Sequence, residues 1–278
     1  MKLRVLMVTH NRHDYTKLSL QRLCETVPAD ARITVWDNAS SQEMIEVLKA
    51  FEDRPQIERI IYNKTNEKLW GPTNWFWENT KDAEFLSKVD DDGLMPEKWV
   101  ETLTQAHHDI PQAGILGTWR FMDEDFYPDL AIRKIQSFGA HQLMRSCWVE
   151  GSGYIMKRSV VDKIGPLTPG ESFTAYGIRA AAADYINGWY YPFLYQEHMD
   201  DPRAAHSAMK TEADFHRLKP LSATTFNIAT REQWIALNKD LARRVQASSF
   251  NPRDYLGWRA RGKRALYRLL GRSYMPRT

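Results

Sequence analysis

Short apolar runs alternate with amphipathic stretches along the first two hundred residues. Residues 3–9 (LRVLMVT) form a continuous apolar run of strand length, which is typical of a parallel strand buried on both faces. Leucines within residues 18–27 then recur at helical spacing, and a second short apolar run follows at 32–36. Strands that alternate with helices in this way favour right-handed βαβ units and a parallel sheet.

The same alternation predicts the later elements. We expect further strands at residues 57–62, 84–89, 114–121, 145–156 and 189–195. The run at 145–156 contains Gly151-Ser152-Gly153, where the backbone can approach a ligand closely. We also expect a helix over 180–187 that ends at Gly188. From about Ala204 the pattern is helical and charged, so the sequence predicts an α/β domain with a helical C-terminal extension.

Composition agrees with a globular cytoplasmic protein. The 278 residues are 43% hydrophobic and 26% charged, which are ordinary globular values. Cys24 and Cys147 lie far apart without metal-binding spacing, which fits a reducing compartment. No secretory segment and no apolar run long enough to span a bilayer is present. We therefore expect a cytoplasmic location, with at most peripheral attachment at the inner face of a membrane.

Polar clusters follow three of the predicted strands. These are His10-Asn11-Arg12, Asp37 and the triplet Asp90-Asp91-Asp92. Ligands of parallel sheets bind beyond the carboxyl ends of the strands, so all three clusters should share one edge. Two like charges about 4 Å apart repel by roughly 4 kcal/mol at an effective dielectric of about 20, so the triplet favours a nearby cation. Carboxylate oxygens suit magnesium or manganese; a solvated acidic turn is the alternative.

Four segments resemble a known family in their order and rough spacing. They are VTHNR at 8–12, WDNAS at 36–40, VDDD at 89–92 and EGSG at 150–153. They resemble the family 2 glycosyltransferases, which have the GT-A fold and use nucleotide-sugar donors. The resemblance covers about residues 3–200. It implies a GT-A catalytic domain over residues 1–204 and a helical, basic extension over 205–278.

The resemblance also implies the site residues. Asp37 would contact the nucleoside, and Asp90 and Asp92 would form the Asp-x-Asp motif that touches the ribose and binds Mn²⁺ or Mg²⁺. His198 resembles a further metal ligand of some enzymes with this fold; a surface or core histidine is the alternative. The implied nucleotide-binding residues are Thr9, Asn11, Arg12, Asp37, Asn66, Asn74, Asp90 and Asp91. The implied metal ligands are Asp90, Asp92 and His198.

The sequence departs from the family where a catalytic base is expected. Inverting members usually carry an acidic pair before the last strand, but residues 173–180 (FTAYGIRA) contain no carboxylate. Candidate bases are Glu171, Asp184 and Glu150. A retaining mechanism, or a catalytically silent sugar-nucleotide-binding or scaffold protein, remains an alternative. A nucleotidyltransferase is a weaker one, because the glycine-rich basic N-terminal loop of sugar-nucleotide pyrophosphorylases is missing.

The resemblance implies a UDP- or GDP-sugar donor and a saccharide or lipid-linked acceptor, as in surface polysaccharide or glycoconjugate synthesis.

Residues 253–278 differ in charge from the rest of the chain, which we call the body. They hold eight basic residues and one acidic residue, a net charge of +7, whereas the body sums to −4. Helical spacing places on one face the four residues Arg261, Arg264, Arg268 and Arg272. It places on an adjacent face Tyr255, Trp258, Leu266, Leu269 and Leu270.

Such a basic amphipathic helix suits an anionic membrane surface; docking on the catalytic domain is the alternative. We do not expect nucleic-acid binding, because the body is acidic and no recognised module is present.

Overall fold

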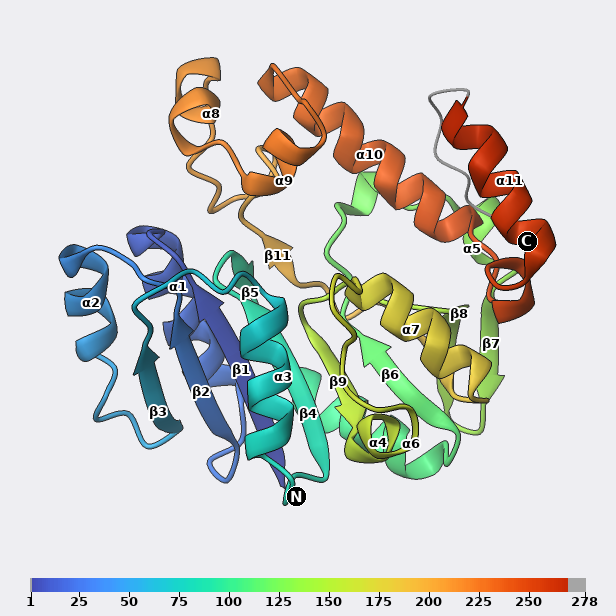
Figure 1. The fold of residues 1–278 in the computed structure, drawn as a ribbon, viewed down its shortest axis with the longest axis horizontal. Coiled ribbons are helices and arrows are strands. Elements are labelled where there is room, and N and C mark those ends of the chain that lie inside the picture. The colour runs from blue at the N-terminus through green and yellow to red at the C-terminus, as the bar shows by residue number, and fades with distance from the viewer. Residues whose placement is uncertain (1, 270–278) are drawn as a thin grey trace.

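A mixed nine-stranded sheet forms the centre of the computed structural model, which describes residues 2–269 (Figure 1). In sheet order its strands are β3 (Ile57–Tyr62), β2 (Arg32–Asp37), β1 (Leu3–Thr9), β4 (Phe85–Asp90), β9 (Tyr154–Lys157), β6 (Ala113–Gly117), β10 (Ile186–Tyr191), β8 (His141–Ser146) and β7 (Ile135–Phe138). Strands β1 to β4 are mutually parallel, and β10 is parallel to β6. Strand β9 is antiparallel to both its neighbours, β4 and β6.

Helices cover both faces of the sheet. One face packs against α1 (His13–Thr26), α2 (Gln42–Lys49) and α4 (Trp99–Asp109). The other packs against α3 (Trp70–Asn79), α6 (Arg158–Ile164) and α7 (Phe173–Ala182). The apolar run of β1 is buried because its two faces contribute to the two cores. This arrangement confirms the predicted α/β fold, with a large central sheet flanked by helices.

The helix expected over 180–187 is misplaced. Helix α7 ends at Ala182, and Asp184 has a φ of 69°, which interrupts helical geometry before β10 begins at Ile186. Gly188 lies inside β10 rather than at a helix end. A Cβ at this position would lie 2.5 Å from the Met144 carbonyl oxygen of β8, so close strand packing explains the glycine.

The strand expected over 145–156 is two strands. Residues up to Ser146 belong to β8, which forms a hairpin with β7, and β9 begins only at Tyr154. The intervening loop contains Gly153, whose φ of 68° is in the left-handed region that favours glycine. The glycine-containing segment is therefore a loop beside β4 and not an interrupted strand.

The C-terminal extension is helical, as predicted. Its described residues, up to Leu269, include α8 (Glu212–Leu218), α9 (Leu221–Thr225), α10 (Arg231–Ala247) and α11 (Trp258–Leu269), which lie above the sheet in Figure 1. Ala242 and Val245 of α10 are buried in the same hydrophobic core as the apolar side chains of α3 and α7. The buried Lys134 ammonium donates hydrogen bonds to the Val245 carbonyl (2.6 Å) and the Ser248 hydroxyl (3.0 Å). The extension thus shares its core with the preceding domain.

Helix α11 packs less closely on the body. Trp258 and Leu269 are 77% and 85% exposed, whereas Tyr255, expected on the same face, is buried in the turn before the helix and packs edge-on against Trp148. The predicted arginine face falls on side chains at 261, 264, 268 and 272 that lie outside the described part of the chain. Within residues 2–269, no helix has both the length and the apolar content that crossing a membrane requires.

Candidate active site

The three polar clusters meet at the carboxyl edge of the parallel strands. In the sheet register Thr9 lies opposite Asp37, and Val8 lies opposite Asp90, so the loops after β1, β2 and β4 are neighbours. The first two loops are also joined directly, because the Ser41 amide donates to Asn11 Oδ1 (2.8 Å). Asn11 adopts a φ of 52°, which an asparagine tolerates better than most residues. The expected common edge is therefore present.

Asp37 lies at this edge with an unused oxygen. The carboxylate is 1% exposed; its Oδ2 accepts a hydrogen bond from the Ser40 amide (3.1 Å), and its Oδ1 has no hydrogen-bond partner. The neighbouring Thr9 hydroxyl is also buried without a partner. Buried polar atoms usually find partners, and leaving one unpaired costs roughly 1–3 kcal/mol. Both atoms are consistent with a ligand that supplies hydrogen-bonding groups at this position.

Asn66, in the loop before α3, and Asn74, within α3, both have structural partners. Asn66 Oδ1 accepts from the Lys68 amide (2.8 Å), within its own loop. Asn74 pairs with the backbone of Leu167 through both ends of its amide (2.8 and 3.0 Å), which joins α3 to the loop before α7. These contacts match the alternative of ordinary loop hydrogen bonds, and the nucleotide role of both residues stays a prediction.

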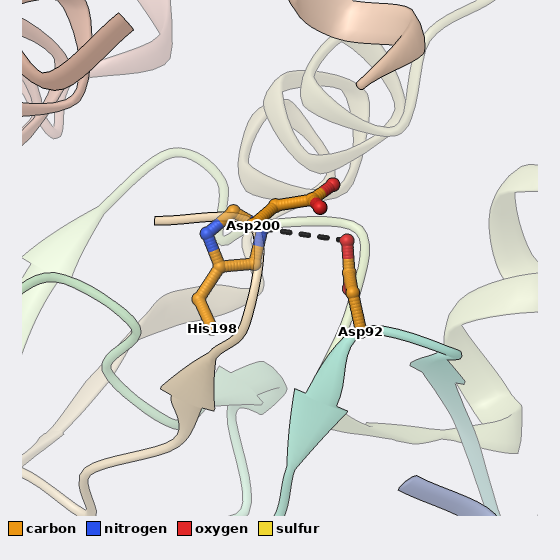
Figure 2. Close-up of side chains that lie close together, drawn as sticks. All are labelled: Asp92, His198 and Asp200. Atoms are coloured by element: carbon orange, nitrogen blue, oxygen red, sulfur yellow. Dashed lines mark ion pairs between the residues drawn. The ribbon is translucent and has the colours of Figure 1, made fainter. Parts of the chain in front are cut away.

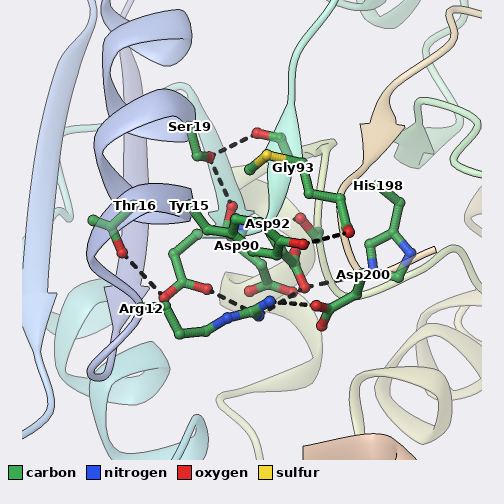
Figure 3. A network of polar contacts seen from close by, with 12 residues as sticks. Arg12, Tyr15, Thr16, Ser19, Asp90, Asp92, Gly93, His198 and Asp200 are labelled. Atoms are coloured by element: carbon green, nitrogen blue, oxygen red, sulfur yellow. Dashed lines mark hydrogen bonds and ion pairs between the residues drawn. The ribbon is translucent and has the colours of Figure 1, made fainter. Parts of the chain in front are cut away.

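A cluster of carboxylates surrounds the Arg12 guanidinium (Figure 3). Arg12 Nη1 lies 3.2 Å from Asp92 Oδ2 and 3.6 Å from Asp91 Oδ1, and Nη2 pairs with Asp200 Oδ1. The guanidinium also lies over the Tyr15 ring, 4.7 Å from its centroid. The cation that the acidic triplet implied is thus supplied, within the described residues, by a side chain of the first loop.

Asp92, His198 and Asp200 form a group that can hold a metal ion (Figure 2). One ligand atom from each lies within 4.8 Å of the others. The short strands β5 (Gly93–Leu94) and β11 (Glu197–His198) pair antiparallel with His198 opposite Gly93, which places the imidazole beside Asp92. His198 Nε2 lies 3.5 Å from Asp92 Oδ2. Two carboxylates and an imidazole fit Mn²⁺ or Mg²⁺.

Asp90, expected among the metal ligands, lies outside this group. Its carboxylate pairs with Lys88, and its amide donates to the Ser152 hydroxyl (2.8 Å).

Asp200 was not predicted as a metal ligand from the sequence. The only sequence signal for it was its position two residues after His198 in the segment HMDD, since its approach to Asp92 depends on long-range pairing of β5 with β11.

The electrostatics of the cluster reflect burial and close packing. Burial raises the pKa of Asp91 to about 7 and that of Asp200 to about 6, although Arg12 opposes both shifts. For Asp92, burial is outweighed by His198 and Arg12, which hold its pKa well below the usual range. On the far side of His198, Arg120 Nη1 lies 3.1 Å from the imidazole Nδ1. Two arginines therefore border the group.

The three candidate bases lie in different surroundings. Glu171 is held by Arg179 (2.8 Å) and the Thr168 amide (2.9 Å), so its carboxylate is already neutralised. Asp184 is exposed beyond the end of α7, before β10 begins, and so lies at the sheet edge opposite the site. Glu150 accepts a hydrogen bond from Trp189 Nε1 (2.8 Å) and directly precedes the loop that contacts Asp90.

Comparison with known proteins identifies the family. The family model described as glycosyl transferase family 2 matches residues 4–165. The chain belongs to this family. It is accordingly a glycosyltransferase, which confirms the resemblance of the four motifs. A search of curated protein sequences finds no match.

Solved structures of glycosyltransferases share the fold. The mannosyltransferase PcManGT from Pyrobaculum calidifontis, in complex with GDP-Man and Mn²⁺, is similar with a TM-score of 0.58 and 14% identity over 97% of this chain and 80% of that one. S. aureus TarS 1-349 in complex with UDP-GlcNAc has a TM-score of 0.53 and 14% identity, over 95% and 76% of the two chains. GalNAc-T7 with UDP, GalNAc and Mn²⁺ has a TM-score of 0.57 and 13% identity, over 71% and 44%. At these identities the likeness shows the GT-A fold.

The unused oxygen of Asp37 generates the first testable prediction. We expect Asp37→Ala to weaken binding of a nucleoside diphosphate about tenfold or more, because the ligand group opposite Asp37 would lose its buried partner. Calorimetric titration with UDP and with GDP measures the change. Asp82→Ala, which removes a surface aspartate paired with Arg4, is the matched control and should leave the affinity unchanged. Equal affinities of Asp37→Ala and the wild-type protein would remove Asp37 from the site.

Proposed function

We propose that this protein is a metal-dependent glycosyltransferase that moves a sugar from a UDP- or GDP-sugar to a saccharide or lipid-linked acceptor. The observation that carries the proposal is the convergence of Asp92, His198 and Asp200 beside the strand edge that carries Asp37. Family membership supports the reaction class. Similar structures contain GDP-Man with Mn²⁺ and UDP with Mn²⁺, which supports the donor and ion classes.

The residues divide into two parts of a donor site. Asp37, with Thr9 at the end of β1 and Asn11 in the following loop, binds the nucleoside, because Asp37 Oδ1 and the Thr9 hydroxyl are buried without a partner within the protein. Asp92, His198 and Asp200 hold the metal ion where the diphosphate would lie. A bound divalent ion neutralises the charge that develops on the departing nucleoside diphosphate. The chain itself orients the ion through three side chains fixed by β5 and β11.

Glu150 is our candidate general base. Glu171 is neutralised by Arg179, and Asp184 lies at the opposite edge of the sheet, whereas Glu150 adjoins the loop whose Ser152 hydroxyl contacts the Asp90 amide. The Trp189 indole holds one carboxylate oxygen of Glu150 and fixes the orientation of the side chain. A base in this position would accept the proton of the acceptor hydroxyl.

We propose that the extension gives the enzyme peripheral contact with an anionic membrane, which would suit a lipid-linked acceptor in surface polysaccharide or glycoconjugate synthesis. The most exposed apolar side chains of α11 are Trp258, Leu266 and Leu269. At about 100° per residue they fall within one arc of roughly 80° on the helix. Each basic residue near an anionic surface contributes about 1 kcal/mol, and the net charge of +7 over residues 253–278 supplies several.

The metal role is tested with Asp92→Asn, which removes the charge of one ligand while keeping its shape. We expect Mn²⁺ affinity and Mn²⁺-dependent hydrolysis or transfer of UDP- and GDP-sugars to fall by at least about 100-fold, since loss even of supporting contacts to a ligand costs 10–100-fold. Calorimetry and release of nucleoside diphosphate provide the measurements. Asp82→Asn is the control. A normal metal-dependent rate in Asp92→Asn would contradict the assignment.

The role of Glu150 is tested with Glu150→Gln, which keeps the hydrogen bond from Trp189 but cannot accept a proton. We expect transfer to slow by about 10²–10⁴-fold, while affinities for Mn²⁺ and nucleoside diphosphate stay at the wild-type values. Single-turnover transfer and calorimetry separate the two effects. If transfer is unchanged, the base lies elsewhere or the mechanism needs none.

Membrane contact is tested by co-sedimentation with phosphatidylcholine vesicles that contain phosphatidylglycerol. We expect binding at low salt that weakens at high salt, because exposed charges are screened, and that is lost when Trp258, Leu266 and Leu269 are changed to Ser. The matched control changes Leu221 of α9 and Phe226, which directly follows that helix, to Ser; both are also exposed, and this variant should bind normally. Binding that survives removal of residues 258–278 would overturn the assignment.

A further inference from the structure

The Arg12 guanidinium and a metal ion need the same oxygens. Of the three members of the metal-holding group, two are bound by Arg12: Asp92 through Oδ2 and Asp200 through Oδ1. Asp92 Oδ2 is also the oxygen that faces His198 Nε2 at 3.5 Å. A cation placed between Asp92 and His198 would therefore lie close to the guanidinium and repel it.

The position of Arg12 is held by several independent contacts. Its guanidinium stacks over Tyr15, whose hydroxyl in turn donates to the Met199 carbonyl (2.9 Å), next to Asp200. Asp91 completes the set of acidic partners at 3.6 Å and is itself contacted by the Thr16 hydroxyl (3.4 Å). Arg12 thus closes the cluster as an internal counter-cation, joining the loops after β1, β4 and β11.

We propose that Arg12 and the metal ion compete for Asp92 and Asp200, so that the ion binds only when the guanidinium leaves these carboxylates. This inference rests on the proposed metal site and adds a control of its occupancy. Once released, the guanidinium lies at the start of α1, in the first loop that borders the nucleoside edge. There it can pair with the donor diphosphate, and the helix N-terminus also favours an anion at that position.

Two expected results distinguish competition between Arg12 and the metal ion from a purely structural role of Arg12. Mn²⁺ alone should bind the wild-type protein weakly. Only the molecules in which Arg12 has left Asp92 and Asp200 can bind the ion, and the apparent Mn²⁺ affinity is reduced in proportion to their fraction of the population. UDP or GDP should strengthen Mn²⁺ binding by giving Arg12 another anionic partner. By linkage, the ion should strengthen nucleotide binding by the same factor.

The test measures Mn²⁺ affinity of the full chain by calorimetry, without nucleotide and with UDP or GDP. We expect Arg12→Gln to bind Mn²⁺ alone about tenfold or more tightly than wild type, and the added effect of nucleotide to shrink. Arg4→Gln, which removes an arginine paired with Asp82 at the opposite edge, is the matched control and should leave Mn²⁺ affinity unchanged. Unchanged or weaker Mn²⁺ binding in Arg12→Gln would overturn the inference.

Arg12→Lys provides a second variant if Arg12→Gln does not fold. Lysine keeps the positive charge, but its single ammonium group cannot bridge two carboxylates as the planar guanidinium does. The Mn²⁺ affinity of Arg12→Lys should therefore still exceed that of wild type. An Mn²⁺ affinity equal to that of wild type would count against competition. The result also separates the two proposals. If no variant binds Mn²⁺, the metal site itself is wrong. If wild type binds Mn²⁺, Asp92→Asn does not and Arg12→Gln binds no tighter, only the competition is wrong.

Discussion

The burial of three carboxylates around a single guanidinium is the interaction on which the site depends. Asp91, Asp92 and Asp200 come from two loops that are distant in the sequence, and without a cation they would repel one another across a poorly hydrated space. Arg12 offsets that repulsion from a third loop. Because the guanidinium contacts all three carboxylates, it links the first loop, the acidic turn and the segment after β11.

The C-terminal extension stabilises the same arrangement from outside. The Trp234 indole of α10 donates a hydrogen bond to the Asp200 carbonyl (2.7 Å), and the other end of α10 enters the core beside α7. Lys134 joins that end to the sheet layer through the Val245 carbonyl. The extension therefore has a structural function in the site that is separate from the membrane contact proposed for α11.

Local patterns were sufficient for the parallel strands, because β1, β2 and β4 are short apolar runs followed by polar turns. They also placed Asp37 and the acidic turn on one edge, since parallel topology determines that position. They failed where tertiary contacts decided the structure. The pattern over 180–187 suggested a helix that ends at Gly188, but the observed helix ends at Ala182, and close packing of β10 on β8 makes Gly188 part of a strand. The proximity of Asp200 and Arg12 depends on the β5–β11 pairing, which no local pattern reveals.

The hydrogen bond from Trp234 to Asp200 has a consequence for how the enzyme is made. During synthesis the parallel strands and the acidic turn leave the ribosome first, then the segment with His198 and Asp200, and α10 only later. While α10 is still inside the ribosome, the Asp200 carbonyl has no hydrogen bond from the Trp234 indole. Nascent chains that end before α10 would therefore carry all nine strands of the central sheet, while the Asp200 carbonyl beside Arg12 would lack its hydrogen bond from the indole.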